Sequence, residues 1–304
     1  MIVVVGVGAV GGACAAPLCV SRSDVILGVR TPFKRLRVEG LERRVAVEPR
    51  LVSSPEGLGQ ADWFLLATKV HQVDGAEPWF RECVGPETKV AVLQNGVEHV
   101  ERVGAWVANE RVLPVVVDCP AIASEPGLVQ LRRAPQLTVP HGAMGRGFAG
   151  LFDGTYVMVK ETEDITTGLW QKLCVNVTGG ALAALAGKPL PEIWHPRLPE
   201  IARRLADECA AVGRAEGAVL REDDVRRIAD HASQATSGGV PSTLTDRLAG
   251  RELEADARNG AVVRFGVRHG IETPVNARAA VLLSRCHQSE GNLLDELCEC
   301  LAPR

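Results

Sequence analysis

The sequence predicts an α/β protein in which the first half forms a doubly wound parallel sheet and the second half is all helical. In the first half, short apolar runs alternate with intervals of helix length, which is typical of parallel strands joined by crossover helices. From about Ile165 onward, the chain is rich in alanine, leucine and charged residues with helical spacing. We therefore expect two domains, residues 1–162 and residues 163–304.

Each expected element follows from a local pattern. Buried strands are predicted at four apolar runs, residues 2–5, 24–30, 61–69 and 89–95, with a further extended segment at 45–52. Long helices are predicted at about residues 165–187, 197–217 and 250–269. The last of these helices is expected to end at Gly270, before "IETP".

A glycine-rich turn, "VGVGAVGG", follows the first expected strand and precedes an alanine-rich helix. Gly6, Gly8 and Gly11 have the G-x-G-x-x-G spacing of a Rossmann-type domain, in which the glycines permit a tight turn, a close approach to a pyrophosphate and close helix packing. Because the flanking elements fit, we prefer dinucleotide binding to a plain glycine turn. The residues expected to contact the cofactor here are Gly6, Val7, Gly8, Ala9, Val10 and Gly11.

The end of the second expected strand indicates which dinucleotide is bound. An NAD site usually has an acidic residue there for the ribose hydroxyls, whereas this chain has Arg30, in "LGVRTPFKR". An arginine can pair with the 2′-phosphate of NADP, with Lys34 or Arg35 assisting. The alternative is an ordinary solvated arginine at a strand end. The sequence therefore favours NADP(H).

Composition excludes several classes of partner. The 304 residues carry a formal net charge of −3 with basic and acidic side chains interspersed, so we expect no nucleic acid partner. The first apolar run breaks on glycine and lacks a basic region before it, so we expect neither a membrane segment nor a signal peptide, and a cytoplasmic location.

The nine cysteines are an odd number spread along a large chain, and we expect them to be free thiols. Cys298 and Cys300 form one close pair without a second pair or a nearby histidine, so no metal site is expected.

Several segments, together with the glycine turn, occur in the order found in a known family. They are "ATKVHQV" (67–73), "LQNGVEHVE" (93–101), "LWQKLCVNV" (169–177) and "LEADARNGAVVRFGVRHGIETPVN" (253–276). With these motifs the chain resembles the ketopantoate reductase family of NADPH-dependent enzymes over nearly its whole length. The resemblance implies a Rossmann-type dinucleotide-binding domain, a helical substrate and catalytic domain, and an active site in the cleft between them.

The resemblance places the family's catalytic lysine, a general acid that polarises the carbonyl, on Lys172 and a substrate-binding asparagine on Asn176. Their i, i+4 spacing independently puts both side chains on one face of a helix. A helix lysine is otherwise most often a surface residue.

Four further residues take roles from the resemblance, and three of them have a plainer alternative. Asn95 matches an asparagine near the nicotinamide ribose and the reactive centre, although Asn-Gly is also a common turn. Lys69 matches a lysine that lines the cofactor cleft. Glu254 matches a catalytic carboxylate that contacts substrate, although it could be a surface residue near a helix start. Ser242 matches the serine that holds the substrate carboxylate, or it could cap a helix.

The chain also departs from the family. Gly180 stands where members commonly carry a second asparagine, and Leu190 stands in place of another substrate-contacting asparagine. We expect Gly180 to leave space of side-chain size in the pocket. With fewer amide donors facing the substrate, ketopantoate should then be a poor substrate compared with a bulkier ketone.

The leading hypothesis is an NADPH-dependent reductase that transfers hydride to the carbonyl of a small 2-oxo acid, with ketopantoate as the default. One alternative is a related enzyme that reduces another ketone or an imine. A non-enzyme alternative is an NADP-binding sensor or structural protein, against which the joint presence of Lys172, Asn176, Asn95 and Glu254 argues. The assembly state stays open, with a homodimer as one option.

Overall fold

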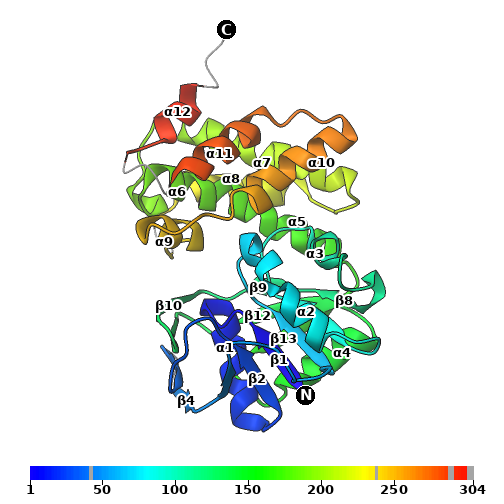
Figure 1. Cartoon of the computed structure of the whole chain (residues 1–304). Helices are drawn as coiled ribbons and strands as arrows, with labels where there is room; N and C mark the ends of the chain where they lie inside the picture. The colour runs from blue at the N-terminus through cyan, green and yellow to red at the C-terminus, as the bar shows by residue number, and fades with distance from the viewer. Residues whose placement is uncertain (41–43, 237–238, 287–290, 300–304) are drawn as a thin grey trace. The chain divides into compact units, whose positions relative to one another are not determined.

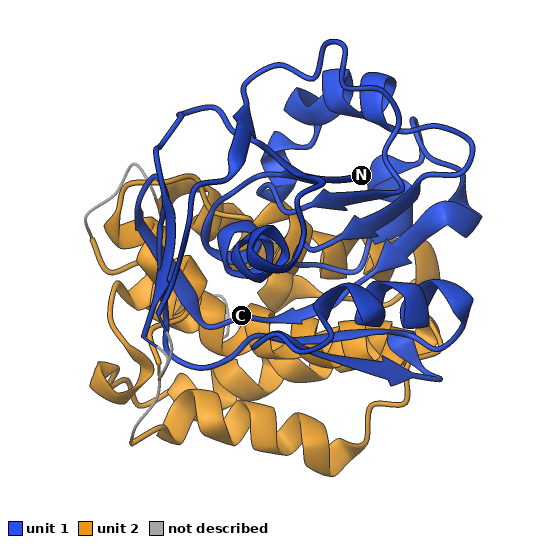
Figure 2. Cartoon of the chain, turned by 90° about the horizontal axis from the view of Figure 1, so that it is seen from below, with its two compact units in different colours: residues 1–165 blue, residues 166–304 orange. Residues whose placement is uncertain are grey.

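The computed structural model describes residues 1–40, 44–236, 239–286 and 291–299. The chain divides into two compact units, residues 1–165 and residues 166–304 (Figure 1, Figure 2). Unit 1 contains the strands together with short helices, and the regular elements described in unit 2 are helices. The predicted fold class is confirmed.

A parallel sheet in the order β5-β2-β1-β6-β7-β8 forms the centre of unit 1. Its strands are β1 (Ile2–Val5), β2 (Val25–Gly28), β5 (Arg50–Val52), β6 (Trp63–Leu66), β7 (Lys89–Val92) and β8 (Val112–Pro114). Strands β2 and β5 lie on one side of β1, and β6, β7 and β8 follow on its other side, so the direction of strand addition reverses between β1 and β6. Ligands of doubly wound sheets bind outside the carboxyl ends of the strands at such a switch point, so this edge is where a cofactor is expected.

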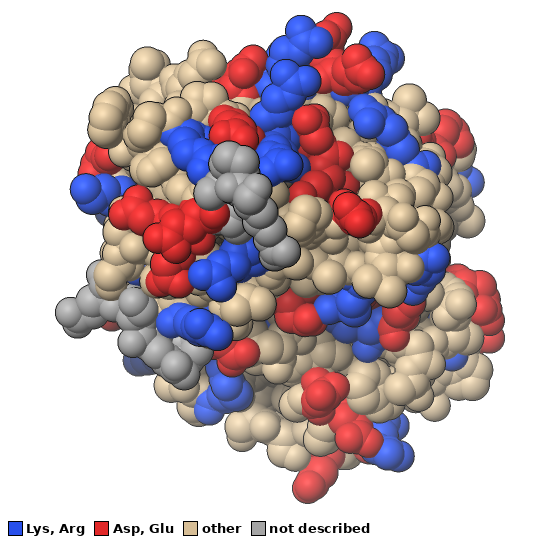
Figure 3. All heavy atoms as spheres, turned by 90° about the horizontal axis from the view of Figure 1, so that it is seen from above, with Lys and Arg blue, Asp and Glu red and all other residues tan. Residues whose placement is uncertain are grey.

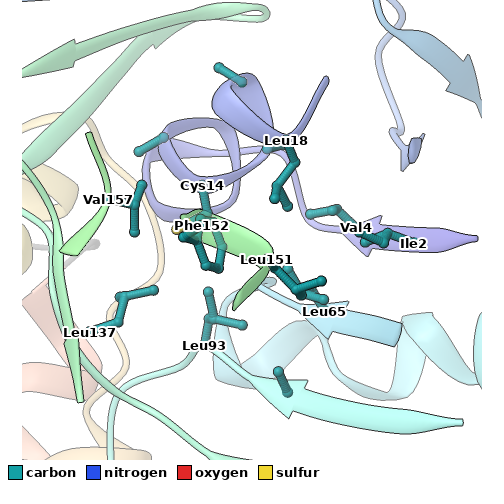
Figure 4. Packing of buried hydrophobic residues seen from close by; sticks show 14 of the residues in the cluster. Ile2, Val4, Cys14, Leu18, Leu65, Leu93, Leu137, Leu151, Phe152 and Val157 are labelled. Atoms are coloured by element: carbon teal, nitrogen blue, oxygen red, sulfur yellow. The ribbon is translucent and has the colours of Figure 1, made fainter. Parts of the chain in front are cut away.

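Helices cover this sheet because the strands are apolar on both faces. They are α1 (Ala9–Ser21), α2 (Glu77–Cys83) and α3 (His99–Val103). Cys14 and Leu18 of α1 belong to the same buried cluster as Val4 and Leu65 of the sheet, as Figure 4 shows. This packing fixes the start of α1 relative to the end of β1, which is the place of the glycine turn.

Two smaller sheets complete unit 1, in the orders β10-β11-β3-β4 and β13-β12-β9. Their elements, with one further helix, are β3 (Leu36–Glu39), β4 (Val45–Val47), β9 (Val116–Asp118), β10 (Ala121–Glu125), β11 (Leu128–Leu131), β12 (Gln136–Pro140), α4 (Ala143–Ala149) and β13 (Met158–Thr162).

Unit 2 begins with a long helix that changes its winding in the middle. Helix α5 (Ile165–Val175) continues through a π-helical turn, Asn176–Gly180, into α6 (Ala181–Ala186), which ends at Gly187 with φ of +68°. The remaining helices are α7 (Leu198–Ala215), α8 (Glu222–Gln234), α9 (Ser242–Leu248), α10 (Ala261–His269), α11 (Pro274–Arg285) and α12 (Leu294–Glu299).

The helix predicted over residues 250–269 starts later than expected. Gly250 has φ of +63°, and the backbone N–H of Arg251 donates to the carbonyl of Asp246, which closes α9. The next helical segment is a second π-helical turn, Asp256–Gly260, which leads directly into α10. The predicted start at residue 250 is therefore wrong, because the segment before Asp256 first has to end α9.

Surface charge and cysteine chemistry agree with the sequence. On the face drawn in Figure 3, basic and acidic side chains are interspersed. No helix in the described part of the chain is long and apolar enough to cross a membrane. The eight described cysteines are free thiols, as predicted, whereas Cys300 lies outside the described residues.

Candidate active site

The glycine turn between β1 and α1 leaves an opening at Gly8. Gly6 has φ of +94°, and a β-carbon there would lie 2.4 Å from the backbone nitrogen of Thr68. A β-carbon on Gly11 would lie 2.0 Å from the carbonyl oxygen of Gly6. At Gly8, by contrast, an added β-carbon would meet no described atom within 4 Å. Two glycines are thus required by the fold itself, and the middle one faces open space of the kind that a pyrophosphate needs.

The start of α1 fits an anion. Gly8 stands at the N-cap and has no side chain with which to cap the helix, and the first turn, from Ala9 to Gly12, carries no acidic residue. The backbone N–H groups of a helix N-terminus carry partial positive charge and are satisfied by phosphate oxygens in dinucleotide sites. The residues present therefore fit a dinucleotide at this turn.

Arg30 follows β2 by two residues and its side chain is exposed. Because β1 and β2 are adjacent, with Val5 paired to Gly28, Arg30 lies on the same carboxyl edge as the glycine turn. Of the two residues expected to assist it, Arg35 donates to the Glu48 carboxylate at 2.9 Å. Lys34 is exposed.

Lys69 and Asn95 follow the neighbouring strands β6 and β7 on the same edge. The side-chain amide of Gln94 ties the two strand ends together by donating to the carbonyl oxygen of Thr68 at 2.9 Å and to its hydroxyl at 3.0 Å. Arg102 in turn donates to the side-chain oxygen of Gln94 at 3.2 Å and to the carbonyl of Asn95 at 3.3 Å. Gln94 and Arg102 were not among the sequence-based candidates.

A buried histidine supports this edge. His99 is 1% exposed, and its Nε2 lies 3.0 Å from the carbonyl oxygen of Gln94. Burial and the neighbouring Arg102 guanidinium lower the pKa of His99 to about 4, so the imidazole is neutral at neutral pH. Nε2 therefore carries the proton that it donates to the carbonyl, and His99 acts here as a fixed hydrogen-bond donor.

In unit 2, Lys172 and Asn176 lie one turn apart where α5 meets the π-helical turn. Both side chains are half-buried. A π-helical turn widens the helix by one residue and frees a carbonyl, and such turns occur often at functional sites. Here the carbonyl of Val177 accepts a hydrogen bond from the side chain of Asn259 at 3.2 Å.

Glu254 and Ser242 are brought together by a residue that we did not predict. Arg258 lies in the second π-helical turn, and its Nη2 donates to the Glu254 carboxylate at 3.1 Å and to the Ser242 hydroxyl at 3.2 Å. Its Nη1 donates to the hydroxyl of Thr243 at 2.5 Å. The side chains of Glu254 and Arg258 are each only 3% exposed. The i, i+4 spacing of an acid and an arginine was visible in the sequence, but the two hydroxyl contacts were not.

The expected space beside Gly180 is filled, so that prediction is wrong. A β-carbon on Gly180 would lie 3.3 Å from the hydroxyl of Thr243 and 3.6 Å from Nη1 of Arg258. The guanidinium of Arg258 thus occupies the region in which we expected room for a larger substrate. Leu190, the other departure from the family, is half-buried and lies 3.3 Å from the β-carbon position of Gly179.

Buried amides hold the second π-helical turn in place. Asn259 donates to the side chain of Asn276 at 2.9 Å, and Asn276 donates to the Glu208 carboxylate at 2.8 Å. Asn259 and Asn276 are fully buried, where each amide hydrogen bond that is lost leaves an unsatisfied polar group. These hydrogen bonds fix the backbone at Asn259 and therefore also at Arg258, the residue before it.

Comparison with known proteins agrees with this geometry. The sequence profile described as ketopantoate reductase PanE/ApbA matches residues 2–145, and the profile of its C-terminal region matches residues 164–287. A 2-dehydropantoate 2-reductase from Caulobacter vibrioides is 44% identical over 284 residues, which cover 93% of this chain and 98% of the relative.

Solved structures share the fold. A PanE/ApbA family ketopantoate reductase from Ralstonia eutropha superposes with a TM-score of 0.84 and 27% identity, covering 95% of this chain and 99% of that protein. A dimeric ketopantoate reductase from Staphylococcus aureus superposes with a TM-score of 0.83 at 23% identity, covering 95% and 99%, and shows the fold alone. Both halves of the chain thus match one family in sequence and in fold, and the family reaction is hydride transfer from NADPH. The chain belongs to the ketopantoate reductase family.

Proposed function

We propose that the protein reduces ketopantoate to pantoate with NADPH. The observation that carries this proposal is the position of Lys172, one helical turn before Asn176. The helix continues to Gly180, which lies beside Arg258, the ion-pair partner of Glu254. A proton donor and a set of polar groups suited to a small acid are thus presented by the same part of unit 2. The close relatedness to a 2-dehydropantoate 2-reductase supports this substrate.

NADPH, when bound, supplies the hydride. The glycine turn binds its pyrophosphate through the N–H groups at the start of α1, and Arg30 binds its 2′-phosphate through a charge-assisted pair. Lys69 adds a positive charge at the same edge, which attracts either the pyrophosphate or the substrate carboxylate. Asn95, held through its backbone by Arg102, contacts the nicotinamide ribose.

Lys172 supplies the proton. Its ammonium group polarises the substrate carbonyl and donates a proton to the oxygen on which negative charge develops, and Asn176 hydrogen-bonds the substrate from the same helix face. Ser242 binds the substrate carboxylate. Glu254 contacts a substrate hydroxyl, and its position is held by Arg258.

A steady-state assay of NADPH oxidation, with ketopantoate and a panel of other 2-oxo acids, ketones and imines, tests this function. We expect ketopantoate to be reduced with the highest kcat/KM of the panel. A higher kcat/KM for an imine or for another ketone would contradict the substrate assignment. Binding of NADPH without turnover of any compound would contradict the assignment as an enzyme.

We also propose that the protein acts in the cytoplasm and as a homodimer. The eight free thiols suit a reducing compartment, and a structural relative is described as dimeric. Cell fractionation and light scattering after size-exclusion chromatography test these two points. A membrane-bound or exported pool, or a monomer at micromolar concentration, would contradict them.

A further inference from the structure

Arg258 has features that a purely structural arginine does not need. It is almost fully buried, one of its acceptors is a buried carboxylate, and its Nε has no hydrogen-bond partner among the described residues. Replacing a buried ion pair by apolar residues of similar volume is often neutral or stabilising, so such a pair is weak evidence for a role in stability. An incompletely satisfied buried guanidinium therefore calls for another explanation.

The partners of Arg258 point to the substrate side of the site. Its acceptors include Ser242 and Glu254, the two residues of this region for which substrate contacts are proposed. A single guanidinium thus sets the distance between a hydroxyl group and a carboxylate. Because the guanidinium is planar and its donors have fixed directions, it fixes both partners more narrowly than an ammonium group would.

Gly180 is the complementary residue on the facing π-helical turn. Its missing side chain leaves the room that Nη1 of Arg258 and the Thr243 hydroxyl occupy, at 3.6 Å and 3.3 Å from the β-carbon position. An asparagine at this position would extend beyond its β-carbon toward the same two groups. Gly180 and Arg258 therefore form a matched pair from two distant parts of the sequence.

We propose that Arg258 is a positioning residue that determines substrate specificity: it orients Ser242 and Glu254 for the polar groups of a hydroxylated 2-oxo acid, in the space that Gly180 provides. This inference rests on the proposed reductase function. This proposal replaces our expectation of a more open and less polar pocket. The guanidinium of Arg258 lies in the region where the family's asparagine amide is missing at Gly180.

The test compares the variants Arg258→Met and Arg258→Lys with wild type. Methionine keeps much of the volume but removes all donors, and lysine keeps the charge but loses the planar fork. We expect Arg258→Met to raise KM for ketopantoate about tenfold or more, because Ser242 and Glu254 lose the charged hydrogen-bond donor that positions them. The affinity for NADPH should be unchanged. Arg258→Lys should fall between Met and wild type.

Arg247→Met is the matched control. Arg247 is also buried in unit 2, but its donors bind the backbone carbonyls of Ala184 and Leu185 at the end of α6. We expect this variant to lower Tm and to leave KM within about twofold of wild type. If Arg258→Met lowers Tm in the same way without a change in KM or kcat, Arg258 is structural and the proposal is wrong.

A second comparison uses Gly180→Asn. Alone, it should raise KM, because the new side chain displaces Arg258 or Thr243. In the double variant with Arg258→Met, the increase in KM, expressed as a free energy, should be smaller than the sum for the two single variants. The effects of substitutions at residues in contact are generally not additive. Strict additivity would contradict the matched pair. If Arg258→Met fails to fold, Arg258→Lys with and without Gly180→Asn decides the same question.

Calorimetry of ketopantoate binding to the enzyme loaded with NADP⁺ separates this inference from the proposed function. That complex cannot react, so it reports substrate binding without turnover. Tight binding to wild type and at least about tenfold weaker binding to Arg258→Met supports the inference whether or not NADPH is oxidised. Equal binding to wild type and to Arg258→Met contradicts it. Failure of wild type to turn over any 2-oxo acid contradicts the proposed function instead.

Discussion

Gly6 and Gly11 lie so close together that a β-carbon on Gly11 would stand 2.0 Å from the carbonyl oxygen of Gly6. No side chain fits this contact, because the obstacle is backbone and cannot turn away. Gly8, between them in the sequence, has open space in the same test. Gly6 and Gly11 therefore permit close packing of the backbone, whereas Gly8 leaves space for a ligand. Substitutions can distinguish these two roles.

Gly11→Ala should lower Tm strongly or prevent folding, because α1 has to move away from the end of β1. Gly8→Ala should leave Tm within a few degrees of wild type but weaken NADPH binding about tenfold or more, because the new methyl group occupies the approach of the pyrophosphate. Thermal unfolding and fluorescence titration with NADPH measure the two effects. Gly75→Ala, also in open space but after β6, is the control and should change neither.

Arg30→Asp should narrow or reverse the preference for NADPH over NADH. Loss of a charge-assisted pair with the 2′-phosphate costs roughly 1.5–3 kcal/mol, or about tenfold or more in affinity, and the new carboxylate can accept from the ribose hydroxyls of NADH. The measurement is Kd for both cofactors. Arg35→Ala should have a smaller effect, because its guanidinium already binds Glu48. Equal affinities of wild type for NADPH and NADH would disprove the role of Arg30.

Lys172→Ala should lower kcat by about 10²–10⁴ while NADPH affinity stays close to wild type, since a positioned general acid contributes to the chemical step and not to cofactor binding. Rapid kinetics with saturating NADPH provide the test. Lys188→Ala, an exposed lysine of the same unit, should retain full activity. If Lys172→Ala turned over within a few-fold of wild type, another group would be the proton donor.

The buried His99 predicts a specific pH dependence of stability. Its pKa of about 4 lies below the unfolded value of 6.5, so folding favours the neutral imidazole. The contribution of neutral His99 to the free energy of unfolding is complete above pH 6.5. It is lost as the pH falls toward 4, because the imidazole of the unfolded chain binds a proton at a higher pH than that of the folded chain. At pH 5 the loss is about 2 kcal/mol.

Urea unfolding at pH 8 and pH 5 measures this loss. We expect the difference in unfolding free energy between the two pH values to be smaller for His99→Asn than for wild type. The exposed His231→Asn should leave the difference unchanged. An equal pH dependence for wild type and His99→Asn would show that the imidazole is not held neutral by the fold.

The sequence predicted those features that depend on local spacing. The G-x-G-x-x-G turn, the alternation of strands and helices, and the i, i+4 pair Lys172 and Asn176 each lie within a few residues of one another. The structure confirms the strand, turn and helix around Gly8, although the sequence motif alone could not show that only Gly8 faces open space.

The features that the sequence did not reveal depend on contacts between distant segments. Gly180 suggested an empty pocket, because nothing in its neighbourhood identifies Arg258 as the group that fills the space. The role of Gln94 also depends on the adjacency of β6 and β7, which brings Thr68 within reach. The roles of individual site residues, among them Lys69, Asn95 and Ser242, stay predictions until variants are measured.

The most direct test of the proposed reductase function is a measurement of NADPH oxidation and pantoate formation by wild type with ketopantoate, with Lys172→Ala as control. We expect one pantoate for each NADPH oxidised, a kcat/KM within roughly 10⁴–10⁸ M⁻¹s⁻¹ for wild type, and little turnover by the variant. If wild type binds NADPH but the rate of NADPH oxidation does not depend on ketopantoate, the protein is not a ketopantoate reductase.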